Sequence, residues 1–139
     1  MITTFKVIVS GFVFNSEGKL LVIRRSLDEE TFPGMLAIPG GTTEVVEGSG
    51  LQNDTIENTL IREVKEETDV DITVTDWMES SAIAKQDAAK LYLFFKAEVS
   101  GNEIPSTSPE TPEVFWADLK DVSLDECTPA LKSYLEAHA

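Results

Sequence analysis

Three glutamates, Glu63, Glu66 and Glu67, lie within five consecutive residues and could do chemistry together. In a helix, residues three and four apart share a face, so Glu63 would neighbour both of the others. Carboxylates ~5.5 Å apart at an effective dielectric of ~20 repel one another by roughly 3 kcal/mol per pair. A hard cation such as Mg²⁺, which prefers oxygen ligands, relieves that repulsion. The spacing therefore favours a metal site on a helix over its alternative, a solvated acidic helix face.

Composition narrows the chemistry that these carboxylates would support. The chain has 139 residues and 42% hydrophobic content, which predicts one domain over residues 1–139. Cys127 is the only cysteine and His138 the only histidine, which excludes a disulfide framework, a cysteine zinc site and a histidine-based triad. Acid–base work would fall to carboxylates, Lys, Tyr or metal-bound water.

Charge and hydropathy exclude several classes of partner. The net charge of −14 argues against nucleic-acid binding, although an anionic small substrate is compatible with it if cations neutralise the site. No apolar stretch approaches the ~20 residues that span a bilayer. The first residues lack the features of a signal peptide. We expect no membrane association and a cytoplasmic location.

Hydrophobic periodicity predicts the elements that position the glutamates. A helix is expected over residues 55–68, with Ile56, Leu60 and Val64 on its apolar face and Asp54 and Glu57 forming a capping box at its start. Glu63 and Glu67 would lie at the edge of that face, where solvent is partly excluded. A second helix is expected over 128–138. Strands are expected over 5–14, 19–24, 35–38, 70–74, 81–85, 91–99 and 113–117. Strands on both sides of a long helix predict an α/β fold, specifically an α/β/α sandwich with a mixed β-sheet.

The segment from Gly40 to Val70 resembles the Nudix box of the Nudix hydrolase superfamily, including its MutT-like members. The resemblance rests on Pro39-Gly40-Gly41-Thr42-Thr43-Glu44 and on Arg62-Glu63-Val64-Lys65-Glu66-Glu67. The box is extended and slightly degenerate. Asp54 replaces a Glu, Asp69 replaces the Gly that usually ends the helix, and the loop is about seven residues longer, within 45–53.

The resemblance implies roles for individual residues. Glu63, Glu66 and Glu67, with the backbone carbonyl of Gly40, would hold the metal, and Arg62 would orient one of these glutamates. Glu110, ahead of a Trp-containing strand, would be a further ligand or base, with Glu113 as second candidate and a solvated loop acid as the alternative. Gly41 and Glu44 would contribute to substrate binding, with a solvated loop carboxylate as the alternative for Glu44.

Two further groups of residues could meet the substrate. Arg24 and Arg25 end a strand near the expected cleft and would bind phosphate, or else balance surface charge. The aromatic residues Trp77, Tyr92 and Phe94 could stack on a base, although core packing is the favoured interpretation for each.

The resemblance implies Mg²⁺-dependent hydrolysis of a phosphoanhydride, with Mn²⁺ as an alternative ion. The substrate would be a small nucleotide, a nucleoside diphosphate linked to another group, and the first candidate is a nucleoside triphosphate cleaved to monophosphate and pyrophosphate. MutT-type enzymes that act on oxidised guanine carry a base-reading Asn where residues 128–131 are apolar here, which argues against that substrate. The alternative function is a nucleotide-sensing module with weak or no catalysis. A homodimer is compatible with the family.

Overall fold

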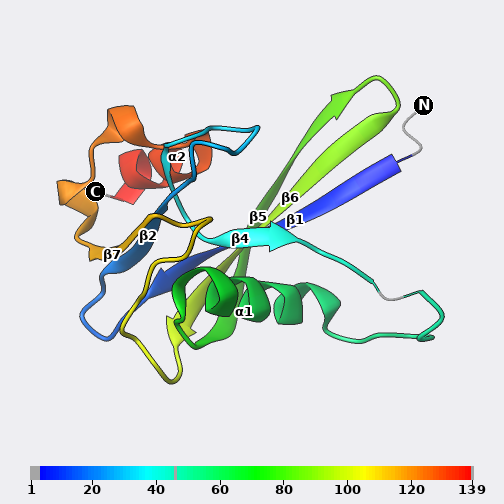
Figure 1. Ribbon diagram of the computed structural model, residues 1–139, viewed down its shortest axis with the longest axis horizontal. Helices are drawn as coiled ribbons and strands as arrows, with labels where there is room; N and C mark the ends of the chain where they lie inside the picture. Colours follow the sequence, from blue (N-terminus) through cyan, green and yellow to red (C-terminus); the bar gives the residue numbers. More distant parts are fainter. Residues whose placement is uncertain (1–3, 46, 139) are drawn as a thin grey trace.

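The computed structural model describes residues 4–45 and 47–138 and shows a mixed β-sheet with one helix on each face (Figure 1). Helix α1 spans Thr55–Thr68 and helix α2 spans Pro129–His138. Short 3₁₀ turns at Leu119–Asp121 and Leu124–Glu126 lead into α2. The predicted α/β/α sandwich is confirmed. No helix among the described residues has the length and apolar character needed to cross a bilayer.

Seven strands form the sheet, in the order β3-β2-β1-β6-β5, with β4 paired to β1 and β7 paired to β2. Only β1 and β6 run parallel, and every other pair is antiparallel. The strands are β1 Thr4–Phe14, β2 Leu20–Arg24, β3 Leu36–Ala37, β4 Gly40–Thr42, β5 Ile72–Lys85, β6 Ala88–Val99 and β7 Glu113–Ala117.

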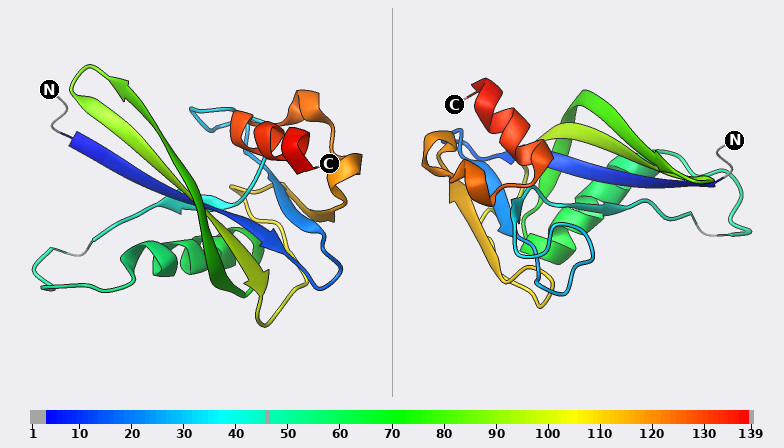
Figure 2. Two further views of the ribbon diagram at one scale, coloured as in Figure 1. Left: turned by 180° about the vertical axis from the view of Figure 1, so that it is seen from behind. Right: turned by 90° about the horizontal axis from the view of Figure 1, so that it is seen from above.

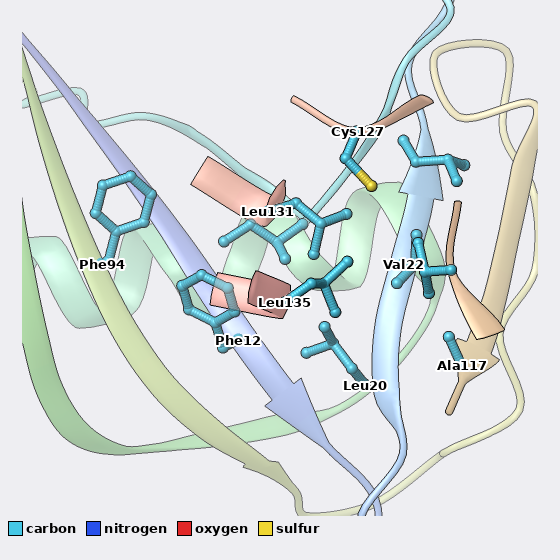
Figure 3. Close-up of a cluster of buried hydrophobic side chains, with 11 residues drawn as sticks. Phe12, Leu20, Val22, Phe94, Ala117, Cys127, Leu131 and Leu135 are labelled. Atoms are coloured by element: carbon cyan, nitrogen blue, oxygen red, sulfur yellow. The ribbon is translucent and has the colours of Figure 1, made fainter. Parts of the chain in front are cut away.

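Alternation along β1 divides the core between the two faces of the sheet. Val9 and Val13 face α1 and pack with its buried Leu60 and Val64. Phe12 faces α2, where its ring stacks on that of Tyr134 with centroids 4.4 Å apart. Figure 3 shows this second cluster, in which side chains from β1, β2, β6, β7, α2 and the segment just before α2 meet: Phe12, Leu20, Val22, Phe94, Ala117, Cys127, Leu131 and Leu135. Two packed layers thus fix α1 and α2 on opposite sides of β1.

The sequence predicts the C-terminal end of α1 better than the cap at its N-terminal end. The predicted capping box is wrong, because Asp54 is in the left-handed conformation (φ 53°) and its side chain makes no cap hydrogen bond. A capping residue normally has extended backbone, which aims its side chain at the first free N–H groups. At the other end Asp69 is left-handed (φ 63°), as expected for a residue in place of Gly, and its N–H donates to the carbonyl of Lys65. Lys65 also pairs with Asp69 and Asp71 at 3.2 and 3.0 Å.

The strand predictions need two corrections. The strands predicted over 70–74 and 81–85 are parts of one long strand, β5, which begins at Ile72. Its register shifts between Val74 and Asp76 and between Trp77 and Glu79 break the alternation that marks a strand. Strand β4 lies where the sequence predicted no strand. Its two glycines carry no strand preference, and β4 exists because Gly40–Thr42 pairs with Ile8–Ser10 of β1.

Strands β1, β5 and β6 extend well beyond the helices. In Figures 1 and 2 their outer ends form a three-stranded projection, with the β5–β6 turn and the start of β1 at its tip. The tip is a two-residue turn, Gln86-Asp87, with Gln86 at φ 59°. We call the part made of residues 4–8 and 79–93 the arm.

Candidate active site

A cleft of about 860 Å³ opens on the α2 side of the sheet and reaches the edge where β4 meets α1. Its floor is formed by alternate residues of β1, β6 and β5, and its walls come from β4, the loop before β3, the loop before β7, α1 and the start of α2. The cleft brings together most of the residues that the sequence predicts for the site. Those lining it are Arg25, Gly40, Gly41, Glu44, Glu63, Glu67 and Glu110.

Gly40 and Gly41 allow α1 to approach the sheet closely at this edge. A methyl group at Gly41 would lie 2.6 Å from Oε2 of Glu63. A methyl group at Gly40 would lie 2.7 Å from the Cα of Ser10 on the paired strand. Either side chain would fill the space that the Glu63 carboxylate or the β1 backbone occupies. The packing of Glu63 against β4 therefore requires Gly41, and the close pairing of β4 with β1 requires Gly40.

Glu67 is the most strongly perturbed acid of the site. Burial, with the neighbouring charges of Glu63 and Glu110, raises its pKa to about 8 against the hydrogen bond from the Gly40 N–H and the charge of Arg25, which lower it. The pKa of Glu63 is raised too, first by burial and then by Glu66 and Glu110, while its hydrogen bond from Arg62 lowers it. These effects show that the carboxylates of α1 repel one another and Glu110 across the cleft.

Glu110 is held by a tight turn in the loop before β7. The backbones of Ser108 and Thr111 exchange two hydrogen bonds of 3.1 and 3.0 Å, and the fully buried Thr111 fixes the turn to the body. The carboxylate of Glu110 is thereby positioned opposite α1, near enough to raise the pKa of both Glu63 and Glu67. Glu113, the second candidate, pairs instead with Arg24 at 2.9 Å.

The adjacent arginines have different environments. Arg25 lines the cleft, where it donates to the carbonyl of Thr31 and pairs with Glu29 at 3.2 Å. Arg24 does not line the cleft, because its guanidinium is engaged by Glu113, by Glu126 and by a backbone carbonyl. Only Arg25 is therefore placed to meet a substrate in the cleft.

Glu66 and Arg62 lie outside the lining of the cleft. Arg62 bridges Glu63 and Glu66 at 3.3 and 3.6 Å. The Glu66 side chain is 60% exposed, whereas that of Glu63 is 21% exposed. Of the three glutamates, Glu63 and Glu67 thus face the cleft and Glu66 lies on the outer side of the helix.

The donor set suits a hard divalent cation. Glu63, Glu67 and Glu110 offer carboxylate oxygens from two sides of the cleft, and their mutual repulsion is what a cation would relieve. As the side chains stand, no three His, Cys, Asp or Glu residues within 4–45 and 47–138 converge closely enough to hold a metal ion together. The chemistry of the donors fits the ion, and coordination requires these side chains to turn toward it.

The distal floor of the cleft contains residues that the sequence alone does not single out. Ile8 and Tyr92 are register partners on β1 and β6, and beyond them Lys6 and Lys90 are partners in the same way. Neither lysine forms an ion pair within the described part of the chain. Like charges directly opposite each other destabilise a sheet. The alternation of β1 and β6 could have placed these residues on one face, but only the parallel register aligns them.

The three aromatic candidates lie in different environments. Phe94 is 6% exposed and belongs to the core, as the favoured interpretation has it, while Tyr92 lies beside it with centroids 6.5 Å apart and borders the cleft. Trp77 is neither core nor cleft residue, because it is 53% exposed and contacts Phe95 edge-on.

Comparison with solved structures shows the same fold in three bacterial and archaeal proteins. A MutT protein from Methanosarcina mazei Go1 has a TM-score of 0.74 and 19% identity, with 99% of this chain and 94% of that chain covered. A NUDIX hydrolase from Nitrosomonas europaea has a TM-score of 0.77 and 20% identity, with 99% and 74% covered. A MutT NUDIX hydrolase from Burkholderia pseudomallei has a TM-score of 0.74 and 20% identity, with 99% and 100% covered.

Comparison by sequence identifies the family. No curated protein matches the chain. The family model for the NUDIX domain matches residues 4–137, which includes every residue of the cleft described above. The chain therefore belongs to the Nudix family and is a pyrophosphohydrolase of the Nudix type.

Proposed function

We propose that the chain hydrolyses the phosphoanhydride of a nucleoside diphosphate linked to another group, with Mg²⁺ as its ion and a nucleoside triphosphate as the first candidate substrate. The observation that supports this most directly is the convergence of Glu63, Glu67, Glu110 and Arg25 on one end of a single cleft. Three carboxylates and one arginine that lines the same cleft suit a diphosphate accompanied by cations.

The residues of the cleft divide the work of the reaction. Glu63 and Glu67 would hold the divalent cation, with the Gly40 carbonyl as a further ligand, and the bound ion would neutralise the diphosphate and make water more acidic. Arg25 contacts the phosphate oxygens with its guanidinium. Glu110 accepts the proton of the attacking water, since it comes from a separate element and is exposed to the cleft. Arg62 keeps Glu63 oriented.

The rest of the substrate would lie along the floor of the cleft. From Ser10, beside Gly40, to Lys6 is four residues of β1, or about 13 Å at ~3.3 Å per residue. A group attached to the diphosphate would pass over Ile8 and Tyr92 and end beside Lys6 and Lys90. A substrate with a second anionic group at that end, such as a further phosphate, would neutralise the two opposed lysines.

A panel assay tests the proposal. The full chain would be incubated with nucleoside triphosphates, dinucleotides and nucleotide sugars, with Mg²⁺ or Mn²⁺, while released phosphate and pyrophosphate are measured. We expect turnover of at least one compound, and a loss of at least ~10²-fold in kcat/KM for Glu67→Gln or Glu63→Gln. The exposed Glu136→Gln on α2 is the matched control and should keep the activity.

The same panel distinguishes the alternative function. Tight nucleotide binding that needs no metal, with no turnover of any compound, would favour a nucleotide-sensing module over an enzyme. Equal activity in the wild type and both glutamate variants would contradict the roles given to Glu63 and Glu67. Within the panel, Lys90→Met should raise KM only for compounds with an anionic group beyond the diphosphate.

A further inference from the structure

The outer edge of β5 is an unprotected strand edge. β5 is the last strand in the sheet order, and β6 is its only paired strand within the described part of the chain. All seven residues from Glu79 to Lys85 are exposed, and Ile83 is 65% exposed. Their register with β6 is regular, from Glu79 opposite Phe94 to Lys85 opposite Ala88, so this part of the edge carries no bulge.

Strand edges of this kind usually carry features that prevent pairing with another chain. Proline, inward-pointing charges, bulges or a covering loop are the common ones. The five residues from Ser80 to Ala84 contain no proline and no charge, and the two bulges of β5 lie before them. The backbone N–H and C=O groups that face away from β6 here are available to a further strand.

The two charged residues that flank this segment have opposite signs and lie at equal distances from its centre. Glu79 and Lys85 lie three residues before and three residues after Ala82. Neither side chain forms an ion pair or a hydrogen bond within residues 4–45 and 47–138. We propose that β5 pairs antiparallel with β5 of a second copy of this chain, around a two-fold axis at Ala82.

That register places each Glu79 opposite the partner copy's Lys85 and each Ser81 opposite the partner's Ile83, with Ala82 meeting its own symmetry mate. Opposite residues of an antiparallel pair share a face, so both charge pairs form on the side of the cleft. Moving the axis by one residue loses this match. With the axis at Ile83, Glu79 would face the partner's Asp87, and with the axis at Ser81, Lys85 would face the partner's Trp77.

The placement of the arm allows two acidic molecules to meet there. The arm carries three lysines and two acids, a net charge of +1 in a chain of net charge −14. Figures 1 and 2 show that it projects beyond both helices, so antiparallel pairing over seven residues leaves the two bodies at opposite ends. The partner's Lys85 would then stand beside Glu79, which borders the cleft. The dimer thereby adds a cation to the rim of each cleft.

Sedimentation measurements with charge variants test the pairing. A contact of one strand edge is small, so we expect a dimer that dissociates in the micromolar range. Lys85→Glu and Glu79→Lys should each weaken association by at least about tenfold, because each reverses two symmetric charge pairs. The double variant Glu79→Lys/Lys85→Glu should restore it. A monomer at all concentrations up to about 0.5 mM, or association unchanged in both single variants, would overturn the proposal.

Cysteine cross-linking tests the register independently. Ala82→Cys should form an intermolecular disulfide on treatment with diamide, since directly opposite residues have Cα atoms about 4.5–5.5 Å apart. Ser80→Cys is the matched control, because it would lie about four residues out of register with its mate and should not cross-link. The native Cys127 is buried and does not compete. Cross-linking of Ser80→Cys as fast as Ala82→Cys would exclude this register.

Discussion

Binding of a divalent cation at neutral pH should release close to one proton from Glu67. The pKa of this carboxyl in the folded chain is about 8, raised from 4.5 by burial and by the charge of Glu63. At pH 7 about ten molecules carry the proton for each one that is ionised. Because a carboxylate binds metal only after losing its proton, the ion must displace that proton. The apparent affinity for Mg²⁺ should therefore weaken about fifty-fold between pH 8 and pH 6.

Isothermal titration of the full chain with Mg²⁺ or Mn²⁺ measures this linkage. Titration at pH 7 in two buffers with different ionisation enthalpies gives the number of protons released, and repetition from pH 6 to 8.5 gives the slope. Glu67→Gln should bind the ion more weakly and lose most of the proton release, with the remainder due to Glu63, whose pKa is also raised. Glu136→Gln should match the wild type. A release below about 0.2 protons in the wild type, or an unchanged slope in Glu67→Gln, would refute the reasoning.

Three further outcomes follow from the same contacts. In the metal-free protein the folded chain keeps the Glu67 proton between about pH 4.5 and 8, whereas the unfolded chain loses it. The free energy of unfolding should therefore fall by a few kcal/mol as pH rises through that window. Urea denaturation should show this fall, and Glu67→Gln should reduce it. Gly41→Ala should lower kcat/KM at least about tenfold, because its methyl group displaces the Glu63 carboxylate; a variant with wild-type kinetics would contradict the close approach. Arg25→Met should raise KM, whereas Arg24→Met should cost about 1 kcal/mol of stability and leave KM unchanged. Kinetics and thermal melting of both variants separate these two effects. A raised KM in Arg24→Met would contradict the assignment of substrate contact to Arg25 alone.

The sequence predicts best those features that depend on local pattern. The limits of α1 follow from its apolar spacing, and Glu63 and Glu67 lie at the expected edge of its apolar face because three- and four-residue steps fix the helix face. Glu66, expected to share their site, lies instead on the outer side of the helix. Its first turn was mispredicted, because the preceding loop holds Asp54 in a left-handed conformation that composition does not encode. Strand β4 was missed for a related reason, since Gly40 and Gly41 become a strand only by pairing with β1.

The choice between neighbouring or similar candidates needed tertiary structure. Arg24 and Arg25 cannot be distinguished by sequence. In the structure they differ because successive residues of a strand point to opposite sides, and Arg24 forms ion pairs with Glu113 and Glu126. Glu110 and Glu113 are likewise neighbouring candidates, and only the structure shows that the Ser108–Thr111 turn places the first opposite α1 while the second begins β7 and pairs with Arg24. The different environments of these residues depend on contacts between segments about 40 to 100 residues apart.

The side chains on the floor of the cleft form rows at regularly increasing distances from Ser10. Successive rows of side chains along β1 and β6 are two residues, or about 6.6 Å, apart. In the proposed function, the bond to be cleaved would lie at the Ser10 row, beside Gly40 and the carboxylates of α1. Each later row, first Ile8 with Tyr92 and then Lys6 with Lys90, reads a different distance along the substrate. Exchanging the side chains of one row would change which substrate lengths are accepted, without altering the carboxylates of α1. Substitutions in a single row would therefore be enough to give a different substrate specificity.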